Sequence, residues 1–484
     1  MTTNPFDGLW LERICAALED SAHPAVITDS GFATGRELIG KAVAAADTLL
    51  SFDLQESRPV PALLTTNADA LALLLAGGVT NRPLAPLAPR QTVAELAAAV
   101  RRTESPILFT ETSCEQTARE VADIVGVTVV AVRDLPVSAE PLRRHPGPTA
   151  MFLHTAGTTG APKCVAVTDS VLGHRARLLR DLIHIGPGDR FATGSPLHHI
   201  GGVGNVLVAL TAGAGIIATT KFSFDWWRGL NELAATHCLL VPSMIEMLLT
   251  NGLIGSVPLR TLIYGASPIA PDTLQRVLDT LPNVAMVSLY GQTEGSPITS
   301  LQPGDHRRAA RHPELLRTVG RPVGELRLKI DDPDGHGVGE VLAAADHLSV
   351  LDADGWLHTG DLGVLDDDGY LRLRGRMHDM VVRGGENVYP LEVENALSAH
   401  PGVASVGVVG VPDTRLGETL AAFVVPVAVG HAPDEDELRT FVRRSLAGYK
   451  IPQYWYFVAE LPLNAAGKVI RGDLRASHAR LRSQ

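Results

Sequence analysis

The residues from His154 to Cys164, "HTAGTTGAPKC", combine glycines, hydroxyl side chains and a lysine, which is the chemistry of a loop that surrounds phosphate. Gly157 and Lys163 have the spacing of the common nucleotide loop, whose final Ser or Thr binds Mg²⁺. Pro162, however, replaces the second glycine and offers no N–H, and Cys164 replaces the hydroxyl. If this loop binds a nucleotide, the contact to its metal must therefore come from elsewhere in the chain.

Short apolar runs and amphipathic stretches alternate around this loop. From about residue 60, we expect strands at "VPALLTT", "RPLAPLAP", "PILFTE", "VTVVAVRDL" and "AMFLHT", and helices at "ADALALLLAGGV" and "TVAELAAAVRRT". This βαβ order predicts a parallel sheet, and the loop follows the end of one strand. In residues 190–300, "THCLLVPS", "LRTLIYGAS" and "VAMVSLYGQTE" predict further strands whose polar ends share one crevice.

The length of 484 residues exceeds what one hydrophobic core usually holds. After residue 320 the sequence changes to short pieces punctuated by glycine, which predict hairpins, and the tail has its own strands and helices. We expect an α/β fold in which the large N-terminal domain has two parallel-type αβα subdomains and a small β subdomain. A smaller α+β C-terminal domain should follow a boundary near residues 375–380.

Composition excludes several classes of function. The hydrophobic fraction of 45% and charged fraction of 20% are those of a soluble globular protein, and the net charge of −11 includes no basic block. We therefore expect neither nucleic acid nor a membrane as partner. The four cysteines lack ligand spacing, the longest apolar stretch (206–220) suits a buried helix-to-strand transition, and the N-terminus lacks a signal-peptide pattern. These features predict a cytoplasmic protein.

Four stretches, read together, resemble the adenylate-forming superfamily of acyl-CoA synthetases, adenylation domains and luciferases. They are "HTAGTTGAPKC", "YGQTEG" (290–295), "GWLHTGD" (355–361) and "NAAGKVIRGDL" (464–474). "YGASPI" (264–269), "GRMHDMVVRGGENVYPLEVE" (375–394) and "AGYKIP" (447–452) are similar to segments of its acyl- and aryl-CoA ligases. The resemblance covers nearly the whole chain. It implies that a carboxylate attacks the α-phosphate of ATP, giving an acyl adenylate and pyrophosphate, and that the thiol of coenzyme A then displaces AMP.

The resemblance also implies roles for individual residues around the nucleotide. Glu294 would help to hold Mg²⁺, Thr293 would donate to the α-phosphate, and Tyr290 would stack on adenine. Asp361 would accept hydrogen bonds from the ribose hydroxyls, with Arg376 close to the same sugar or phosphate. The nucleotide-binding residues expected in this way are Thr155, Gly157, Thr158, Thr159, Gly160, Lys163, Gly265, Ala266, Ser267, Tyr290, Gly291, Thr293, Asp361 and Arg376.

The same resemblance implies a mobile C-terminal domain. Lys468 would be its catalytic lysine, which bridges the carboxylate and the α-phosphate, and His199 would separate the acid pocket from the thiol tunnel. The catalytic set expected is Lys468, Thr293, Glu294, Lys163 and His199, and the residues facing coenzyme A are Gly384, Gly385 and Lys450. We expect an N-terminal domain at 1–375, a hinge at 376–379 and the mobile domain at 380–484. His378 takes the hinge position where the family usually has Asp or Lys.

The expected acid pocket contains mainly small or uncharged side chains and no cation that could pair with a second carboxylate. Its candidate residues are His199, Val203, Gly204, Asn205, Val241, Ser243, Met244 and Ser296. His198 and His199 are adjacent, but we expect them on an extended strand, where neighbours point to opposite faces and cannot share a metal.

Other functions remain open at the level of sequence. The acceptor could be a carrier protein on a separate chain or an amine, and some relatives activate unusual acids such as nitrite. A non-catalytic nucleotide-binding sensor or scaffold is a further alternative. The argument against it is the retention of Lys163, Thr293, Glu294, Asp361, Arg376 and Lys468. The identity of the acid, a homodimeric state and the effect of Cys164 in the loop are also open.

Overall fold

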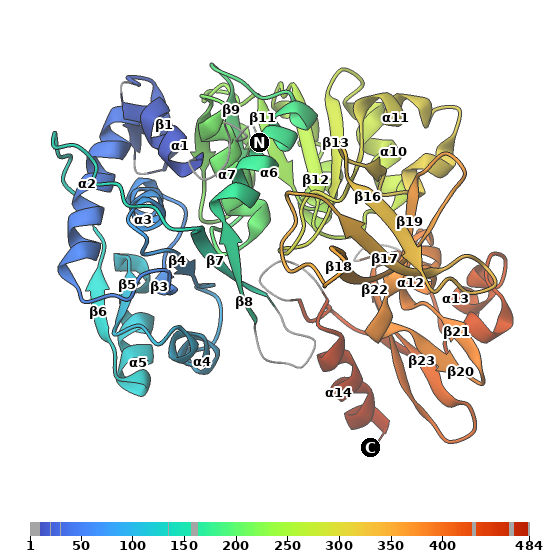
Figure 1. Cartoon of the computed structure of the whole chain (residues 1–484). Coiled ribbons are helices and arrows are strands. Elements are labelled where there is room, and N and C mark those ends of the chain that lie inside the picture. The colour runs from blue at the N-terminus through green and yellow to red at the C-terminus, as the bar shows by residue number, and fades with distance from the viewer. Residues whose placement is uncertain are drawn as a thin grey trace.

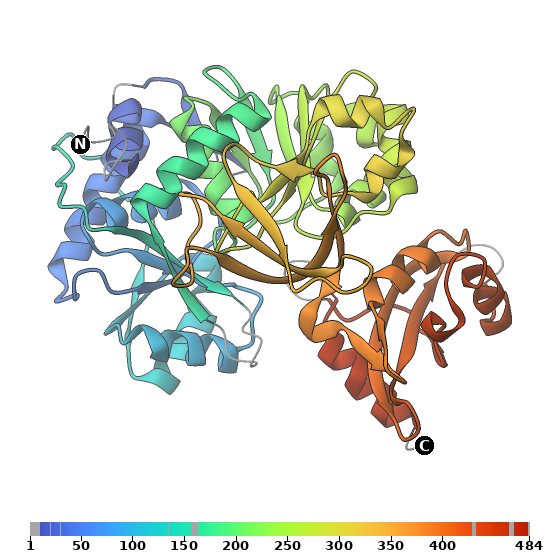
Figure 2. The ribbon, with the colours of Figure 1, turned by 45° about the vertical axis from the view of Figure 1, so that its right-hand side comes forward.

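The computed structural model describes residues 10–19, 21–29, 31–133, 135–155, 163–427, 432–463 and 469–482. Two sheets with covering helices form the N-terminal part, an antiparallel sheet follows, and a fourth sheet forms the C-terminal part (Figure 1). The expected α/β class is confirmed. Figure 2 shows the C-terminal part, orange to red, to one side of the two larger α/β layers.

The first sheet contains the strands expected between residues 60 and 155. Its order is β6-β5-β3-β4-β7-β8, and all neighbours are parallel except β7 and β8. The strands are β3 (Val60–Leu63), β4 (Leu84–Pro86), β5 (Ile107–Thr110), β6 (Thr128–Ala131), β7 (Thr149–Thr155) and β8 (Lys163–Thr168). The helices near it are α2 (Gly35–Ser51), α3 (Ala68–Val79), α4 (Val93–Thr103) and α5 (Glu115–Val125).

The second sheet has the order β15-β14-β13-β12-β11-β9-β10-β1-β2. Its strands are β1 (Pro24–Thr28), β2 (Gly31–Thr34), β9 (Arg190–Thr193), β10 (Gly215–Ala218), β11 (His237–Leu240), β12 (Thr261–Gly265), β13 (Ala285–Tyr290), β14 (Thr299–Leu301) and β15 (Arg321–Pro322). Its helices are α6 (Asp169–Ile183), α7 (Ile200–Thr211), α8 (Phe224–Gly229), α9 (Pro242–Thr250), α10 (Pro271–Thr280) and α11 (Pro303–Arg308). The helix α1 (Trp10–Glu19) contacts α2, α3, α6 and α7.

One hydrophobic core joins these two layers. It contains buried side chains from β3 of the first sheet, β9 and β10 of the second, and helices α1, α2, α3, α6 and α7 between them. The apolar stretch at 206–220 forms the end of α7 and then β10, both buried, so the expected helix-to-strand transition is confirmed. In the described part of the chain, every helix is too short or too polar to cross a membrane.

The antiparallel pieces predicted after residue 320 form a four-stranded sheet of β16 (Arg327–Asp331), β17 (Gly339–Ala344), β18 (Leu357–Leu365) and β19 (Leu371–Arg376). The C-terminal sheet contains β20 (Val381–Arg383), β21 (Glu386–Val388), β22 (Val403–Asp413), β23 (Gly417–Pro426) and β24 (Tyr454–Phe457). Its helices are α12 (Pro390–Ser398), α13 (Glu435–Val442) and α14 (Arg471–Arg482), and short 3₁₀ turns occupy 377–379 and 448–450.

The two parts touch through a small apolar cluster. Tyr389 and Met380 from the C-terminal part pack against Val338 and Leu362 of the antiparallel sheet. The separate cores of the C-terminal sheet lie on both of its faces. The C-terminal part therefore has its own core, in addition to this apolar contact with the antiparallel sheet.

Candidate active site

Four parallel strands of the second sheet bring the predicted site residues to one edge. β9, β11, β12 and β13 are neighbours and run in the same direction, so their carboxyl ends lie side by side. The chain leaving these ends carries His199, Val241, Gly265 and Gly291 in turn. The expectation that these strand ends share one edge of the sheet is confirmed, and such edges are where open α/β sheets bind ligands.

Tyr290, Asp361 and Arg376 form a hydrogen-bonded group at this edge. The hydroxyl of Tyr290 donates to Oδ2 of Asp361 at 2.6 Å, and Nε of Arg376 lies 2.7 Å from Oδ1. Asp361 and Arg376 are paired across β18 and β19, which sets their approach, and Asp361 is only 6% exposed. Burial, and secondly the charge of Asp361, raises the pKa of Tyr290 well above its ordinary value, so the phenol stays protonated and donates.

The turn after β12 has a backbone conformation that its sequence does not favour. A Cβ on Gly265 would lie 2.3 Å from the carbonyl oxygen of Leu289 on the neighbouring strand, so this position accepts only glycine. Ala266 follows with φ of 67°, in the left-handed region that non-glycine residues rarely adopt. Such strain is found mainly at functional sites, and here it falls on the residues that were expected to face adenine.

The turn after β13 is held rigidly. The amide of Gln292 donates to the carbonyl of Gly295 at 2.7 Å, and the amide of Gly295 donates back to Gln292 at 3.1 Å. The amide of Ser349 donates to the carbonyl of Glu294 at 2.7 Å, which ties the turn to the loop that follows β17. Thr293 and Glu294 therefore sit between two fixed backbone positions.

The side chain of Arg175, on α6, also binds this turn. Arg175 was not identified from the sequence. Its Nη2 donates to the carbonyl of Thr293 at 3.2 Å, and its Nε donates to the carbonyl of His347 at 3.0 Å. The side chain is only 3% exposed. Burial lowers its pKa to about 10, and the carboxylate of Glu294 opposes this shift, so the guanidinium remains charged at neutral pH.

A sequence signal for Arg175 existed. Leu172, Arg175 and Leu179 recur with helical spacing, so a charged residue occupies the apolar stripe of α6. Such a charge is rarely buried without a reason. Thr359 was also missed: its Oγ1 accepts from the amide of Asp361 at 3.1 Å and donates to the carbonyl of Val341 at 2.7 Å, which fixes the start of the Asp361 strand segment.

Glu294 fits the role of a metal ligand that was expected from the sequence. Its side chain is half-buried, and within the described ranges no hydrogen bond or ion pair occupies the carboxylate. No cluster of three or more His, Cys, Asp or Glu side chains in the described part of the chain could hold a metal by itself. One carboxylate suffices for Mg²⁺ when nucleotide phosphates supply further oxygen ligands.

A small cavity of about 20 Å³ is lined in part by residues that were predicted for the acid pocket. Three predicted pocket residues, Gly204, Asn205 and Ser296, line it. The remaining lining residues are Trp10, Leu172, Arg175, Leu179, Ile200, Gly201, Val208 and Leu289. One of these lining residues, Arg175, is a cation, and it comes from a helix that was not considered for the acid pocket. Val241, Ser243 and Met244 lie instead at the start of α9 and do not line this cavity, and Val203 is fully buried in the core.

The two adjacent histidines are not on an extended strand. His198 and His199 lie in the turn before α7, and their ring centroids are 4.3 Å apart, so the expected opposite orientation is wrong. A turn can bring neighbouring side chains to one side, whereas an extended strand cannot. Burial, followed by the nearby His199 and His154, lowers the pKa of His198 to about 3, so this ring is neutral at physiological pH. Cys164 pairs with His154 across β7 and β8, and its side chain is exposed.

The residues expected to face coenzyme A lie in the C-terminal part. Gly384 and Gly385 form the turn between β20 and β21, with φ of 61° and 92°, so the hairpin alone requires glycine-like conformations. Nζ of Lys450 lies 2.7 Å from the carboxylate of Glu392, and both side chains are mostly buried. Lys450 is therefore paired in this position of the domain.

The predicted hinge lies between β19 and β20. His378 is exposed, and its Nε2 is 3.9 Å from Oδ2 of the adjacent Asp379. Asp379 is buried and accepts from Nε of Arg471 at 3.0 Å and from Nη2 of Arg475 at 3.4 Å, both on α14. Asp379 is thus fixed to the C-terminal part, and His378 immediately precedes this fixed point.

Some predicted residues lie outside the described residues: Gly157, Thr158, Thr159, Gly160 and Lys468. The strands on either side of the phosphate loop are described, and Thr155 pairs with Lys163 at the point where β7 and β8 meet the loop. The loop therefore starts and ends at adjacent positions of the first sheet.

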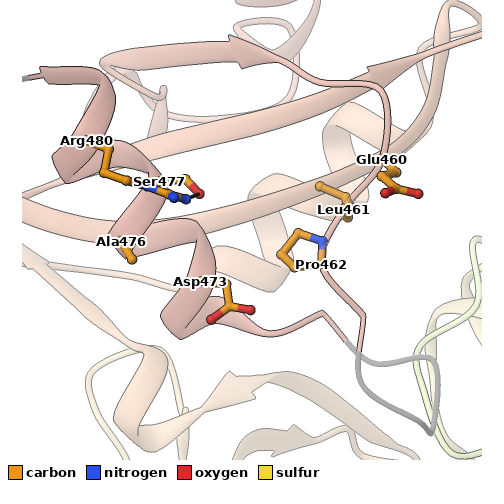
Figure 3. A pocket seen from close by; sticks show the side chains of 7 residues that line it. All are labelled: Glu460, Leu461, Pro462, Asp473, Ala476, Ser477 and Arg480. Atoms are coloured by element: carbon orange, nitrogen blue, oxygen red, sulfur yellow. Dashed lines mark hydrogen bonds between the residues drawn. The ribbon is translucent and has the colours of Figure 1, made fainter. Parts of the chain in front are cut away.

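A larger groove, of about 600 Å³, lies on the C-terminal part between α14 and residues 460–462. Figure 3 shows Asp473, Ala476, Ser477 and Arg480 along the helix, facing the segment of Glu460, Leu461 and Pro462. None of these residues was predicted as part of the site. We therefore place the candidate active site at the strand ends of the second sheet, although this groove has the larger volume.

The fold and the site together define a nucleotide-binding α/β enzyme with a second, smaller domain. Two family models match the chain: "AMP-binding enzyme" over residues 15–349 and "AMP-binding enzyme C-terminal domain" over residues 392–468. The chain belongs to the AMP-binding enzyme family, the adenylate-forming superfamily that the motifs indicated. It is an AMP-forming ligase, a class that uses ATP with Mg²⁺ and, in its CoA-ligase members, coenzyme A.

Individual relatives are similar over most of their length. A fatty acid–[acyl-carrier-protein] ligase, ScoC, of Streptomyces coeruleorubidus is 31% identical, covering 95% of this chain and 94% of its own. An indoleacetate–CoA ligase of Aromatoleum aromaticum is 35% identical, covering 68% of this chain and 67% of its own. The structure of the amide bond synthetase McbA from Marinactinospora thermotolerans superimposes with a TM-score of 0.88 at 28% identity, covering 97% of this chain and 100% of its own.

Proposed function

We propose that this enzyme activates a carboxylic acid as an acyl adenylate and transfers the acyl group to the thiol of coenzyme A. The observation that carries this proposal is the group of Tyr290, Asp361 and Arg376 beside the rigid turn at Thr293 and Glu294. It provides a polar platform for a nucleoside at the point where four strands end. The acid cavity reaches the same turn through Ser296.

The nucleotide would lie across this platform. The carboxylate of Asp361 already accepts from Tyr290 and Arg376, yet its oxygens have further lone pairs that can accept from the ribose hydroxyls. Tyr290 packs against an apolar cluster that includes Ile298, Ala343 and Leu357, and the rest of its ring would face adenine. Gly265, Ala266 and Ser267 would line the opposite side of the base.

The first half-reaction brings two anions together, so neutralising charge is the main task of the site. Bound Mg²⁺, held by Glu294 and the phosphates, would neutralise phosphate charge. Thr293 would donate its hydroxyl to the α-phosphate, and Lys163 and Lys468 would add positive charge. Arg175 keeps the backbone of this turn in place by holding the carbonyl of Thr293.

The second half-reaction would use another position of the C-terminal part. We infer that the domain boundary follows residue 375 and that the hinge at 376–379 ends at Asp379, because the arginines of α14 hold that residue. Rotation about His378 would replace Lys468 at the adenylate by the turn at Gly384 and Gly385 and by Lys450. His199, beside the cavity, would separate the acid from the incoming thiol.

Two other acceptors of the acyl group have support from the relatives. ScoC is a ligase for an acyl carrier protein and matches this chain over nearly its full length, and McbA forms amide bonds. The adenylation step is common to all three acceptors. Product mass with coenzyme A, with an acyl carrier protein and with an amine would distinguish them.

The test of adenylation is exchange of labelled pyrophosphate into ATP. The purified enzyme with Mg²⁺ should show exchange only when a suitable acid is present, and addition of coenzyme A should then yield AMP and an acyl thioester. Lys468→Ala should abolish exchange and leave ATP binding largely unchanged. Absence of exchange across a broad acid panel would remove the enzymatic proposal.

A further inference from the structure

Arg175 carries a positive charge that its surroundings only partly satisfy. Its Nε and Nη2 donate to backbone carbonyls, which are neutral acceptors, and Nη1 is buried with no hydrogen-bond partner among the described residues. A buried cation without a hydrogen-bonded anion is costly, and natural sites usually provide one. The carboxylate of Glu294 attracts it electrostatically but forms no hydrogen bond with it in the described part of the chain.

The guanidinium of Arg175 lines the small cavity beside Ser296, where the substrate acid would bind. Among the described residues, the other polar side chains of the cavity are Asn205, Ser296 and Trp10, whose indole Nε1 is also buried without a hydrogen-bond partner there. Nδ2 of Asn205 already donates to the carbonyl of Gly201 at 2.7 Å. An acid with a purely hydrocarbon end would place apolar atoms beside Nη1 of Arg175 and leave it unpaired, which makes such an acid a poor match for this cavity.

We propose that the acid activated by this enzyme carries a second anionic group, and that Arg175 binds this group in the acid pocket. The inference rests on the proposed function, since it names the class of acid. When Glu294 is engaged with Mg²⁺, its charge is shared with the metal, and the second group of the acid becomes the counter-charge of Arg175. Arg175 thus acts as a residue that determines specificity.

The geometry also favours a short acid. The cavity of about 20 Å³ holds little more than one water molecule, so only a compact group at the end of the acid could enter it. Nη2 of Arg175 is 3.2 Å from the carbonyl of Thr293, the residue assigned to the α-phosphate. The second anionic group must therefore lie only a few bonds from the carboxylate that reacts.

The test compares acids of equal carbon number by pyrophosphate exchange. The pairs are malonate with propionate, succinate with butyrate, and glutarate with pentanoate. In at least one pair the wild-type enzyme should have a higher kcat/KM for the diacid. Arg175→Met should lower the diacid-to-monoacid ratio of kcat/KM by about 10- to 100-fold, the range expected for a lost charged hydrogen bond in a buried site. Arg175→Lys should retain part of the ratio.

Arg180→Met is the matched control, because Arg180 lies on the same helix and is exposed beside Asp181. It removes one positive charge from α6 and should leave the ratio unchanged. A wild-type preference for the monoacid in every pair would overturn the inference without depending on any variant. An equal loss for both members of a pair in Arg175→Met would also overturn it, because a residue that only holds the turn at Thr293 affects all acids alike. No exchange with any acid would instead contradict the proposed function itself.

Discussion

Removal of one hydroxyl from Tyr290 tests the nucleotide platform. In Tyr290→Phe, Asp361 loses a donor at 2.6 Å while it remains buried beside Arg376. A hydrogen bond to a charged acceptor contributes about 1.5–3 kcal/mol. With an unfolding entropy of about 2.1 cal/mol/K per residue over roughly 375 residues, this lowers the melting temperature by about 2–4 °C. The KM for ATP should rise about 3- to 10-fold, because the carboxylate assigned to the ribose is no longer held.

Tyr370→Phe is a close chemical control. The hydroxyl of Tyr370 donates to Oδ1 of buried Asp305 at 2.6 Å, and Arg308 and Arg321 lie near that carboxylate. Both variants should lose similar stability in a thermal unfolding assay. Only Tyr290→Phe should raise the KM for ATP in pyrophosphate exchange. An unchanged KM in Tyr290→Phe, or an equal rise in both variants, would refute the assignment of this group to the nucleotide.

Three further substitutions test other parts of the site. Gly265→Ala places a Cβ 2.3 Å from the carbonyl of Leu289, so it should weaken ATP binding and lower stability by about 1–3 kcal/mol. Gly255→Ala is the control, because its Cβ has room and neither property should change. Equal ATP affinities of the two variants in calorimetric titrations would contradict this. Asp379→Asn removes the charged acceptor of two arginines on α14. It should slow both half-reactions in single-turnover assays, because both use the C-terminal part. Unchanged rates would show that the ion pairs between Asp379 and α14 are dispensable. His198 has a folded pKa of about 3, below its ordinary 6.5, so the unfolded chain binds the extra proton and stability falls as pH drops from 6.5 toward 3. His198→Phe should reduce this slope by up to about 1.4 kcal/mol per pH unit in denaturant titrations, and an unchanged slope would mean that His198 titrates normally.

The regular elements could be predicted because their signals are local. The strands ending at Leu240, Gly265 and Tyr290 are apolar runs bounded by small residues, and all three were predicted and found parallel. The residues at 198–199 were misjudged because polar neighbours before a helix resemble the end of a strand. The hydrogen-bonded turn there depends on contacts that no short stretch of sequence specifies.

Contacts between distant segments could not be predicted in this way. Tyr290 and Asp361 are separated by 71 positions, and only the fold shows that the phenol donates to the carboxylate. Arg175 and Thr293 are 118 positions apart, and a charge on the apolar stripe of a helix does not reveal its partner. The motifs therefore indicate the chemistry, while the fold shows that Arg175 lines a cavity beside the turn at Thr293.

The path of one oxygen atom tests the central claim most directly. The acid is labelled with ¹⁸O in its carboxylate and converted with ATP and coenzyme A, and the AMP released is analysed by mass spectrometry. If the carboxylate attacks the α-phosphate, one labelled oxygen stays with AMP when the thiol displaces it. We predict one ¹⁸O in each AMP and none in pyrophosphate. Unlabelled AMP, or label in pyrophosphate or phosphate, would contradict an acyl-adenylate mechanism.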